Sequence, residues 1–370
     1  MMHHVVFISH ARGIHGAETV MLQAIRACTA QGVRVTVVVP SVVPDAGLEV
    51  ALQQLDNVRL MPLAYRAAGV HALRTYLVQL YSRRAAGQLA EYVRREHVDA
   101  IYSNSSITIL GCAVAKMTGV KHIWHWHESV NVWLGWHPSM AKLYRKWLQW
   151  AETIVFISHK QQHDWEETLG VSIPNAQVVY NPIKRISALQ KAAHKHIRIG
   201  FIGHFEPLKN IELLVQTFAR LHAENAATEL WLCGAINETD RQYIYSMTAL
   251  REPIVLVLPQ TSDVAAFYHS IDILVLPSWK ETMPLVVPEA MQAGVCVIQT
   301  DQSGLMELLE DGSETLFFSP YKPEALLPLL QQCLDTDYRR HIAEAGQKKV
   351  QQLQLNNQFD QQITALLCAS

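Results

Sequence analysis

Long hydrophobic runs are missing from this sequence. The first apolar run, Val5–Ile8, ends before Arg12 and is shorter than the core of a signal peptide. A helix that crosses a bilayer needs roughly 20 consecutive apolar residues, and no stretch of the chain reaches that length. The sequence therefore predicts a cytoplasmic protein whose contact with the inner face of a membrane would be peripheral.

Cysteine is scarce, and neither sign of charge dominates. The six cysteines stand far apart and form no C-x-x-C pair, so the sequence favours a reducing compartment over a disulfide framework or a zinc knuckle. The 31 Lys and Arg residues nearly balance the 33 Asp and Glu residues, which leaves a formal net charge of −2. Such a chain has no long-range field for polyanions, and we expect no nucleic-acid partner.

A repeated β–α rhythm runs through the 370 residues, a length that suits two domains. Val5–Ile8 is typical of a buried parallel strand, a turn with Gly13 and Gly16 follows, and a helix comes next. This opening predicts a doubly wound sheet, whose ligands bind at the carboxyl ends of its strands. The other strands that we expect are Val33–Val39, Val98–Tyr102, His122–His127, Ile154–Ser158, Glu229–Cys233, Ile254–Leu258, Ile273–Leu276 and Val295–Gln299.

The chain is expected to divide near residue 185. The stretch Ile183–His196 loses the apolar pattern, and Ile197–Gly203 restarts it as a strand that ends in glycine. We expect two Rossmann-like α/β domains, residues 1–185 and residues 186–354. Spaced apolar residues in Gln347–Gln362 predict a terminal helix, and we expect residues from about 355 to 370 to pack back on the first domain.

The most informative stretch follows the expected strand Ile273–Leu276. Glu281 lies in a loop, and Glu289 stands eight positions later near the start of a helix. The residues after Glu289 read A-M-Q-A-G. This arrangement resembles the E-x7-E signature, followed by A-M-x-x-G, of the family-4 glycosyltransferases, which have the GT-B fold.

The resemblance implies a role for each of these residues. In the family the first glutamate contacts hydroxyls of the donor sugar and the second holds the ribose, so we expect these roles of Glu281 and Glu289. Carboxylates accept hydrogen bonds from hydroxyls, and N–H groups at a helix start favour phosphate. The backbone expected to approach the sugar and phosphates belongs to Thr282, Met283, Pro284, Leu285 and Val286. The alternative is two solvated glutamates that bracket a helix start.

Other family landmarks occur in the family's order. The segment from Gly203 is similar to G-R-[LF]-x-x-x-K, whose cations neutralise the donor pyrophosphate; Lys209 matches the lysine, whereas His204 replaces the arginine. The start of the first helix, Gly16-Ala17-Glu18, resembles the G-G-A-E loop without its doubled glycine. Gly234 and Glu307 are two more expected donor-binding positions. The structural alternatives are an ordinary turn at Gly16, a solvated lysine and a helix-start carboxylate at Glu307.

A histidine is expected beside the reaction centre. The segment Trp124–Ser129 resembles the family segment whose histidine touches the donor sugar, and His127 matches it; with Glu281 and Lys209 it completes the expected catalytic set. His125 and His127 would point to one side of a strand, so a two-histidine metal site and a plain buried histidine are alternatives. The sequence places no third ligand, and we expect neither a metal nor another cofactor.

The segment 137–150 combines cations with aromatic side chains. Lys142, Arg145 and Lys146 stand among tyrosine and tryptophan. Such a helix could rest on a membrane surface or on a lipid-linked acceptor. The alternative is a helix packed through its aromatic residues with solvated cations.

Taken with the resemblance, these features predict a retaining hexosyltransferase. It would move a sugar from a UDP- or GDP-sugar to a glycan or lipid-linked acceptor, in bacterial surface polysaccharide or lipopolysaccharide biosynthesis. Two Rossmann-like domains would face each other across a cleft, with residues 1–185 on the acceptor side and residues 186–354 around the donor. A GT-B sugar-nucleotide epimerase is one alternative. A catalytically silent homologue that binds sugar nucleotide or scaffolds an assembly is another, because His204 departs from the family.

Overall fold

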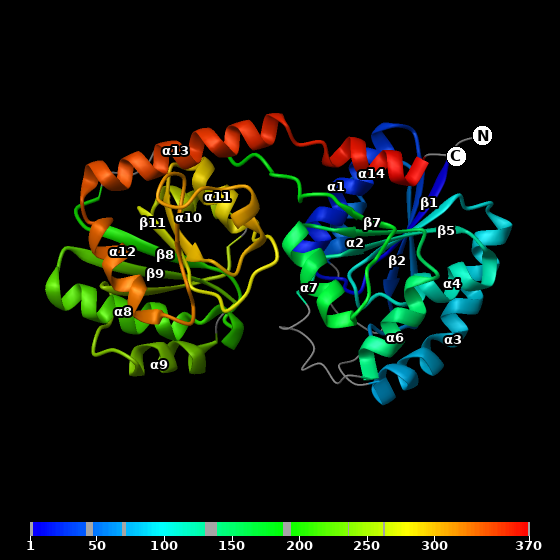
Figure 1. The fold of residues 1–370 in the computed structure, drawn as a ribbon, viewed down its shortest axis with the longest axis horizontal. Coiled ribbons are helices and arrows are strands. Elements are labelled where there is room, and N and C mark those ends of the chain that lie inside the picture. Colours follow the sequence, from blue (N-terminus) through cyan, green and yellow to red (C-terminus); the bar gives the residue numbers. More distant parts are fainter. Residues whose placement is uncertain are drawn as a thin grey trace. The chain divides into compact units, whose positions relative to one another are not determined.

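The structure, a computed structural model, describes residues 3–41, 47–68, 72–129, 139–187, 194–235, 237–261 and 263–368. The chain forms two compact units, Met1–Pro182 together with Gln358–Ser370, and Ile183–Asn357. Each unit contains one parallel sheet with its own helices (Figure 1). The fold class is therefore α/β with two Rossmann-like sheets, as the sequence predicts.

The first unit is built on seven parallel strands in the order β3-β2-β1-β4-β5-β6-β7. These strands are β1 (His4–Ile8), β2 (Arg34–Pro40), β3 (Val58–Leu63), β4 (Ala100–Asn104), β5 (Lys121–Trp126), β6 (Thr153–Phe156) and β7 (Ala176–Val178). Its helices are α1 (Gly16–Ala30), α2 (Gly47–Leu52), α3 (Ala72–Arg95), α4 (Leu110–Thr118), α6 (Ser139–Leu148), α7 (His159–Leu169) and α14 (Phe359–Cys368).

Both faces of this sheet are buried, and β1 shows this residue by residue. Val5 and Phe7 belong to an apolar cluster that includes residues of α1, α2 and α14. Val6 and Ile8 belong to a second cluster, with residues of α3 and α4. Since successive strand residues point to opposite faces, a continuous apolar run is what a strand between two layers of helices requires.

The second unit has six parallel strands in the order β10-β9-β8-β11-β12-β13. They are β8 (Ile197–Ile202), β9 (Thr228–Gly234), β10 (Val255–Pro259), β11 (Ile273–Leu276), β12 (Cys296–Thr300) and β13 (Leu316–Phe318). The α-helices are α8 (Ile211–Glu224), α9 (Glu238–Ser246), α10 (Val264–His269), α11 (Val286–Gln292), α12 (Leu326–Gln332) and α13 (Thr336–Leu355). Three short 3₁₀ turns are η1 (Pro207–Lys209), η2 (Gly304–Glu307) and η3 (Pro323–Ala325).

The carboxyl-terminal segment corrects one prediction. A single helix over Gln347–Gln362 is wrong, because α13 ends at Leu355 and α14 begins at Phe359. The two halves pack in different places. Gln347 in α13 donates to the carbonyl of Gln292 in the second unit at 2.8 Å, whereas the apolar side of α14 is buried against α1 in the first unit.

Candidate active site

Each sheet reverses its strand order at one place. In the first unit this place lies between β1 and β4, and in the second it lies between β8 and β11. Open α/β sheets bind ligands beside such a reversal, outside the carboxyl ends of the strands. Lys209 and Glu281 follow β8 and β11, and Glu18 and Asn104 lie beyond β1 and at the end of β4.

Lys209 and Glu281 form an ion pair at the reversal point of the second sheet. Lys209 Nζ lies 2.7 Å from Glu281 Oε1, and both side chains are largely shielded from water. Lys209 ends the turn η1, which follows β8 directly. The structure therefore joins the two charged residues that the sequence assigns to the phosphates and the donor sugar.

Backbone hydrogen bonds fix the loop that carries Glu281. The N–H of Glu281 donates to the carbonyl of Gln302 at 2.8 Å, and the N–H of Gly304 donates to the carbonyl of Thr282 at 2.9 Å. On the other side, the N–H of Trp279 donates to the carbonyl of Leu208 at 2.9 Å. The loop after β11 is thus tied to the loops after β8 and β12.

The five predicted backbone contacts lie between this loop and the start of α11. Thr282, Pro284, Leu285 and Val286 are partly exposed, whereas Met283 is buried. A residue that sequence analysis did not single out, Tyr268, contacts the second glutamate, Glu289.

Glu289 is held by Tyr268. The Tyr268 hydroxyl donates to Glu289 Oε2 at 2.9 Å. Burial raises the pKa of Glu289, although the hydrogen bond from Tyr268 and the charge of Lys184 work in the opposite direction. A carboxylate that is desolvated but keeps a second oxygen is suited to accept a hydrogen bond from a ligand hydroxyl.

Close packing within the second unit requires a glycine at position 234. A Cβ at this position would lie 2.0 Å from the carbonyl oxygen of Gly203 and 2.5 Å from the Phe205 ring. The ends of β8 and β9 therefore approach each other more closely than any side chain allows. His204 stands next to this contact with its side chain exposed.

Glu307 lies in η2 with its side chain exposed. Ser303, which replaces the first glycine of the family turn, is buried and accepts a hydrogen bond from the N–H of Leu305 at 3.2 Å. The departure at Ser303 thus supplies a cap for the turn.

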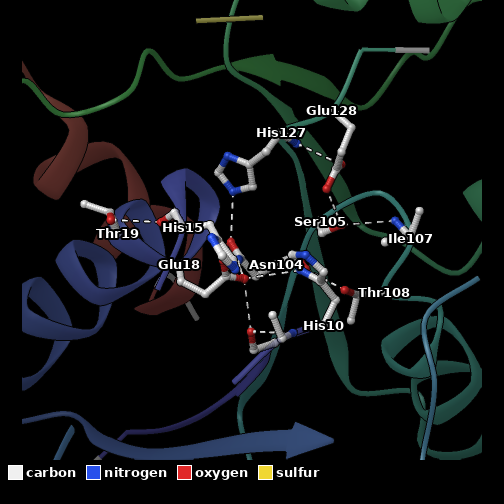
Figure 2. A network of polar contacts seen from close by, with 12 residues as sticks. His10, His15, Glu18, Thr19, Asn104, Ser105, Ile107, Thr108, His127 and Glu128 are labelled. Carbon is white, nitrogen blue, oxygen red and sulfur yellow. Dashed lines mark hydrogen bonds and ion pairs between the residues drawn. The ribbon is translucent and has the colours of Figure 1, made fainter. Parts of the chain in front are cut away.

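In the first unit, His127 takes part in a buried polar network (Figure 2). His127 Nε2 lies 2.9 Å from Asn104 Oδ1, and Asn104 Nδ2 donates to Glu18 Oε1 at 3.5 Å. His10 Nδ1 lies 3.3 Å from the same carboxylate oxygen, and Glu18 is fully buried. Sequence analysis missed Asn104, because its contact with His127 depends on the pairing of β4 with β5.

This network fixes the tautomer of His127. Because the amide of Asn104 presents its NH₂ group to the carboxylate of Glu18, its oxygen faces the histidine and can only accept. His127 therefore carries its proton on Nε2, which leaves the lone pair on Nδ1. Burial lowers the pKa of His127 to about 4, with the Glu128 carboxylate opposing and His10 reinforcing the shift. The ring is neutral at physiological pH.

The Glu128 carboxylate is bound by hydrogen bonds within the first unit. Its Oε2 accepts hydrogen bonds from the N–H of Ser106 at 2.8 Å and from Ser106 Oγ at 2.7 Å, and Oε1 accepts one from Ser105 Oγ. Burial alone would raise the pKa of Glu128, but His10, His127 and these hydrogen bonds together lower it. The carboxylate ties the end of β5 to the loop after β4.

The two-histidine metal hypothesis finds no third ligand in the described residues. The rings of His125 and His127 lie 4.1 Å apart between centroids. Among the residues that the structure describes, no three His, Cys, Asp or Glu side chains gather as a metal site would require. Burial, followed by the neighbouring His127, holds the pKa of His125 well below its usual value.

Gly16 begins α1 and faces open space. A Cβ built on it would meet no atom within 4 Å. Unlike Gly234, it is not required by packing within the chain, so the space beside its backbone is available to a ligand.

The basic aromatic segment folds as α6, and its residues 137 and 138 lie outside the described residues. Tyr144 and Trp147 are buried in the core of the first unit, whereas Lys142, Arg145 and Lys146 are exposed. The structure thus agrees with the packed-helix alternative. The buried rings of α6 are unavailable to a membrane.

Sequence comparisons cover nearly the whole chain. Residues 14–185 match Glycosyltransferase Family 4, and residues 183–349 match Glycosyl transferases group 1. N-acetyl-alpha-D-glucosaminyl L-malate synthase of Bacillus anthracis is 28% identical over 248 residues, which cover 63% of this chain and 64% of that protein. Capsular polysaccharide biosynthesis glycosyltransferase CapM of Staphylococcus aureus is 25% identical over 198 residues, 52% of this chain and 50% of CapM. The chain thus aligns with less than two thirds of either relative.

Solved structures agree on the fold. Anabaena Alr3699/HepE, solved in complex with UDP and glucose, superposes with a TM-score of 0.78 at 17% identity over 99% of each chain. This likeness confirms the GT-B fold that the sequence predicts. With both halves matched and the fold shared, the chain belongs to glycosyltransferase family 4, among the group 1 glycosyl transferases.

Proposed function

We propose that the protein is a retaining hexosyltransferase that takes a UDP- or GDP-sugar as donor and a glycan or lipid-linked molecule as acceptor. The ion pair of Lys209 and Glu281 at the reversal point of the second sheet carries this proposal. It sets a cation for the diphosphate beside a carboxylate for the sugar hydroxyls, where α/β sheets bind ligands. HepE, a structural neighbour, was solved with UDP and glucose.

When the donor binds, Lys209 and Glu281 each exchange their contact with the other for a contact with the ligand. Lys209 turns from Glu281 to the diphosphate, and the freed carboxylate accepts hydrogen bonds from sugar hydroxyls. Glu289 then holds the ribose, and the backbone of Thr282–Val286 lies along the phosphates. His127, neutral and with its lone pair on Nδ1, accepts a hydrogen bond from a sugar hydroxyl.

The chemical step follows from this placement. The bond between the anomeric carbon and the phosphate oxygen breaks while the acceptor oxygen bonds to the same face of the sugar. The acceptor proton passes to the leaving phosphate oxygen. The rate acceleration then comes from positioning the two substrates and from neutralising the charge of the leaving phosphate. Lys209 and the backbone amides supply this neutralisation, and His204 stands where the family has its arginine.

The setting that we propose is bacterial surface polysaccharide or lipopolysaccharide biosynthesis, at the cytoplasmic face of the membrane. The similarity to CapM, named for capsular polysaccharide biosynthesis, supports it. We infer that no metal or other cofactor takes part, since Lys209 can offset the phosphate charge.

Incubation with a panel of UDP-, GDP- and ADP-sugars tests the activity. Transfer to an added acceptor, or slow release of free sugar and nucleotide, is the expected result. An isomerised donor would instead identify an epimerase. Tight nucleotide binding without turnover would identify a silent homologue, and either outcome contradicts the proposal.

A further inference from the structure

Helix α3 carries an exposed apolar stripe. Five of the 13 large hydrophobic side chains that are exposed in the described part of the chain belong to this one helix, with between 45% and 74% of their surface exposed. They are Leu73, Tyr76, Leu77, Leu80 and Tyr81. Their spacing of three and four residues puts them on one face of the helix. We call this face the α3 stripe.

The α3 stripe is separate from the packing face of the same helix. Ala85, Ala86 and Leu89 are buried in the core of the first unit together with Leu110 of α4, and Val78 is buried as well. A helix in a soluble protein ordinarily shows water a polar face opposite its core. Here the outward face is apolar as well, and such contiguous apolar surface marks an interaction site.

Arginines border the α3 stripe. Successive residues of an α-helix are rotated by about 100° around its axis. Viewed along the axis, Arg74 therefore lies roughly 100° to one side of Leu73, and Arg83 lies roughly 80° to the other side. Arg84 lies close to that direction, farther along the helix, and all three side chains are exposed. The guanidinium of Arg66 lies 5.2 Å from the centre of the Tyr81 ring. No Asp or Glu occurs in α3 before Glu91.

The arginines indicate that the partner of the α3 stripe is negatively charged. A helix with leucine and tyrosine on one side and arginines on both flanks fits the interface of a membrane, where the apolar side chains enter the acyl region and the guanidinium groups reach lipid phosphates. None of the described helices is long and apolar enough to span a bilayer. We propose that the α3 stripe and its arginines form a docking surface for an anionic lipid bilayer.

The docking surface is distinct from the segment 137–150, for which the sequence leaves a membrane contact open beside a packed helix. The aromatic residues of α6 are buried, so the membrane contact belongs to α3. The inference does not depend on sugar transfer, because vesicle binding is measured without donor or acceptor. Failure of one proposal therefore leaves the other standing.

Co-sedimentation of the full chain with vesicles tests the docking surface. We expect binding to phosphatidylcholine vesicles that contain 30% phosphatidylglycerol, at most weak binding to phosphatidylcholine alone, and a decline as salt rises. The triple variant Leu73→Gln/Leu77→Gln/Leu80→Gln should lose binding by more than tenfold. Arg74→Gln/Arg83→Gln/Arg84→Gln should lower binding to the anionic vesicles by about a hundredfold, at about fivefold for each arginine near the surface.

Leu355→Gln is the matched control, since Leu355 is 78% exposed on α13. It should bind vesicles as the wild type does, and all variants should keep the wild-type melting temperature because the changed side chains are exposed. A wild-type protein that stays in the supernatant would overturn the proposal. So would vesicle binding that the leucine variant leaves unchanged, or a wild-type dimer, without vesicle binding, that the leucine variant turns into monomers.

Discussion

His127 is held by the amide of Asn104, and burial keeps its ring neutral. A carboxylate in place of Asn104 would stabilise the imidazolium form. Asn104→Asp should therefore raise the pKa of His127 from about 4. If the neutral ring accepts a hydrogen bond from the sugar, the variant loses activity at mildly acidic pH and recovers as pH rises.

The measurement is the pH dependence of kcat/KM for wild type and Asn104→Asp between pH 5 and 8.5. The wild type should show no inflection from His127 in this range. Asn104→Ala serves as a control, because it removes the hydrogen bond without adding a charge. Profiles of identical shape for Asn104→Asp and wild type would contradict the role of the neutral His127 ring as an acceptor for the sugar.

Glu281 offers a second test on a single residue. Glu281→Gln keeps the size of the side chain but removes a charged acceptor, whose hydrogen bonds contribute roughly 1.5–3 kcal/mol. We expect kcat/KM to fall about 10- to 100-fold, mainly through kcat. Glu314→Gln is the matched control, since Glu314 also pairs with a lysine, Lys349, at 3.2 Å. Similar kinetics for the two variants would remove Glu281 from the site.

At the scale of elements, close packing of α4 against the first sheet depends on Gly111. A Cβ there would lie 2.1 Å from Ser103 Oγ and 2.6 Å from His122 Nε2, both buried. Gly→Ala inside a helix ordinarily stabilises by up to about 1 kcal/mol. We expect Gly111→Ala to destabilise instead, by roughly 1–3 kcal/mol, as overpacking does.

Gly87 in α3 is the control for this substitution. A Cβ there would meet nothing within 4 Å, so Gly87→Ala should be neutral or stabilising. Urea denaturation followed by circular dichroism compares the two. Equal stability of both variants would show that α4 can move away from the sheet at little cost.

How far the sequence predicts these elements depends on their burial. Ile273–Leu276 was predicted with the bounds that it has in the structure, because a strand covered on both faces is apolar throughout. Three strands were not predicted. The strand β3 has only its last residue buried, β7 has none, and β13 is three residues long. Edge strands and short strands of this kind have no continuous apolar pattern.

The candidate site was predictable where the sequence resembles the motifs of the family. Lys209 and Glu281 were predicted, and the structure joins them. Asn104 and Tyr268 were not, because their partners lie 23 and 21 positions away along the chain. Such contacts depend on strand register and helix placement, which periodicity does not determine.

For the whole molecule, buried histidines predict sensitivity to acid. Burial lowers the pKa of His122 to about 4, although its hydrogen bond to the carbonyl of Trp150 opposes the shift. Between pH 6.5 and 4 the unfolded chain therefore binds more protons than the folded one at this residue. The free energy of unfolding should fall as pH falls, by up to about 1.4 kcal/mol per pH unit for each such histidine.

Urea denaturation at pH 7, 6 and 5 measures this dependence. His122→Gln should reduce the slope, because glutamine cannot take up the proton. His341→Gln, a change at an exposed side chain, is the control for the substitution of histidine by glutamine itself. A wild-type slope in His122→Gln would show that the ring is protonated within the fold.

Nucleotide binding is the most direct test of the central claim, that the second unit holds a sugar nucleotide through Lys209, Glu281 and Glu289. Isothermal titration calorimetry with UDP, GDP and ADP in the presence of EDTA should find one of them bound, and Glu289→Gln should weaken it by about 10-fold or more, as loss of a charged acceptor does. Glu314→Gln should bind as the wild type does. Binding of none of the three nucleotides, or equal affinity in wild type and Glu289→Gln, would contradict the account.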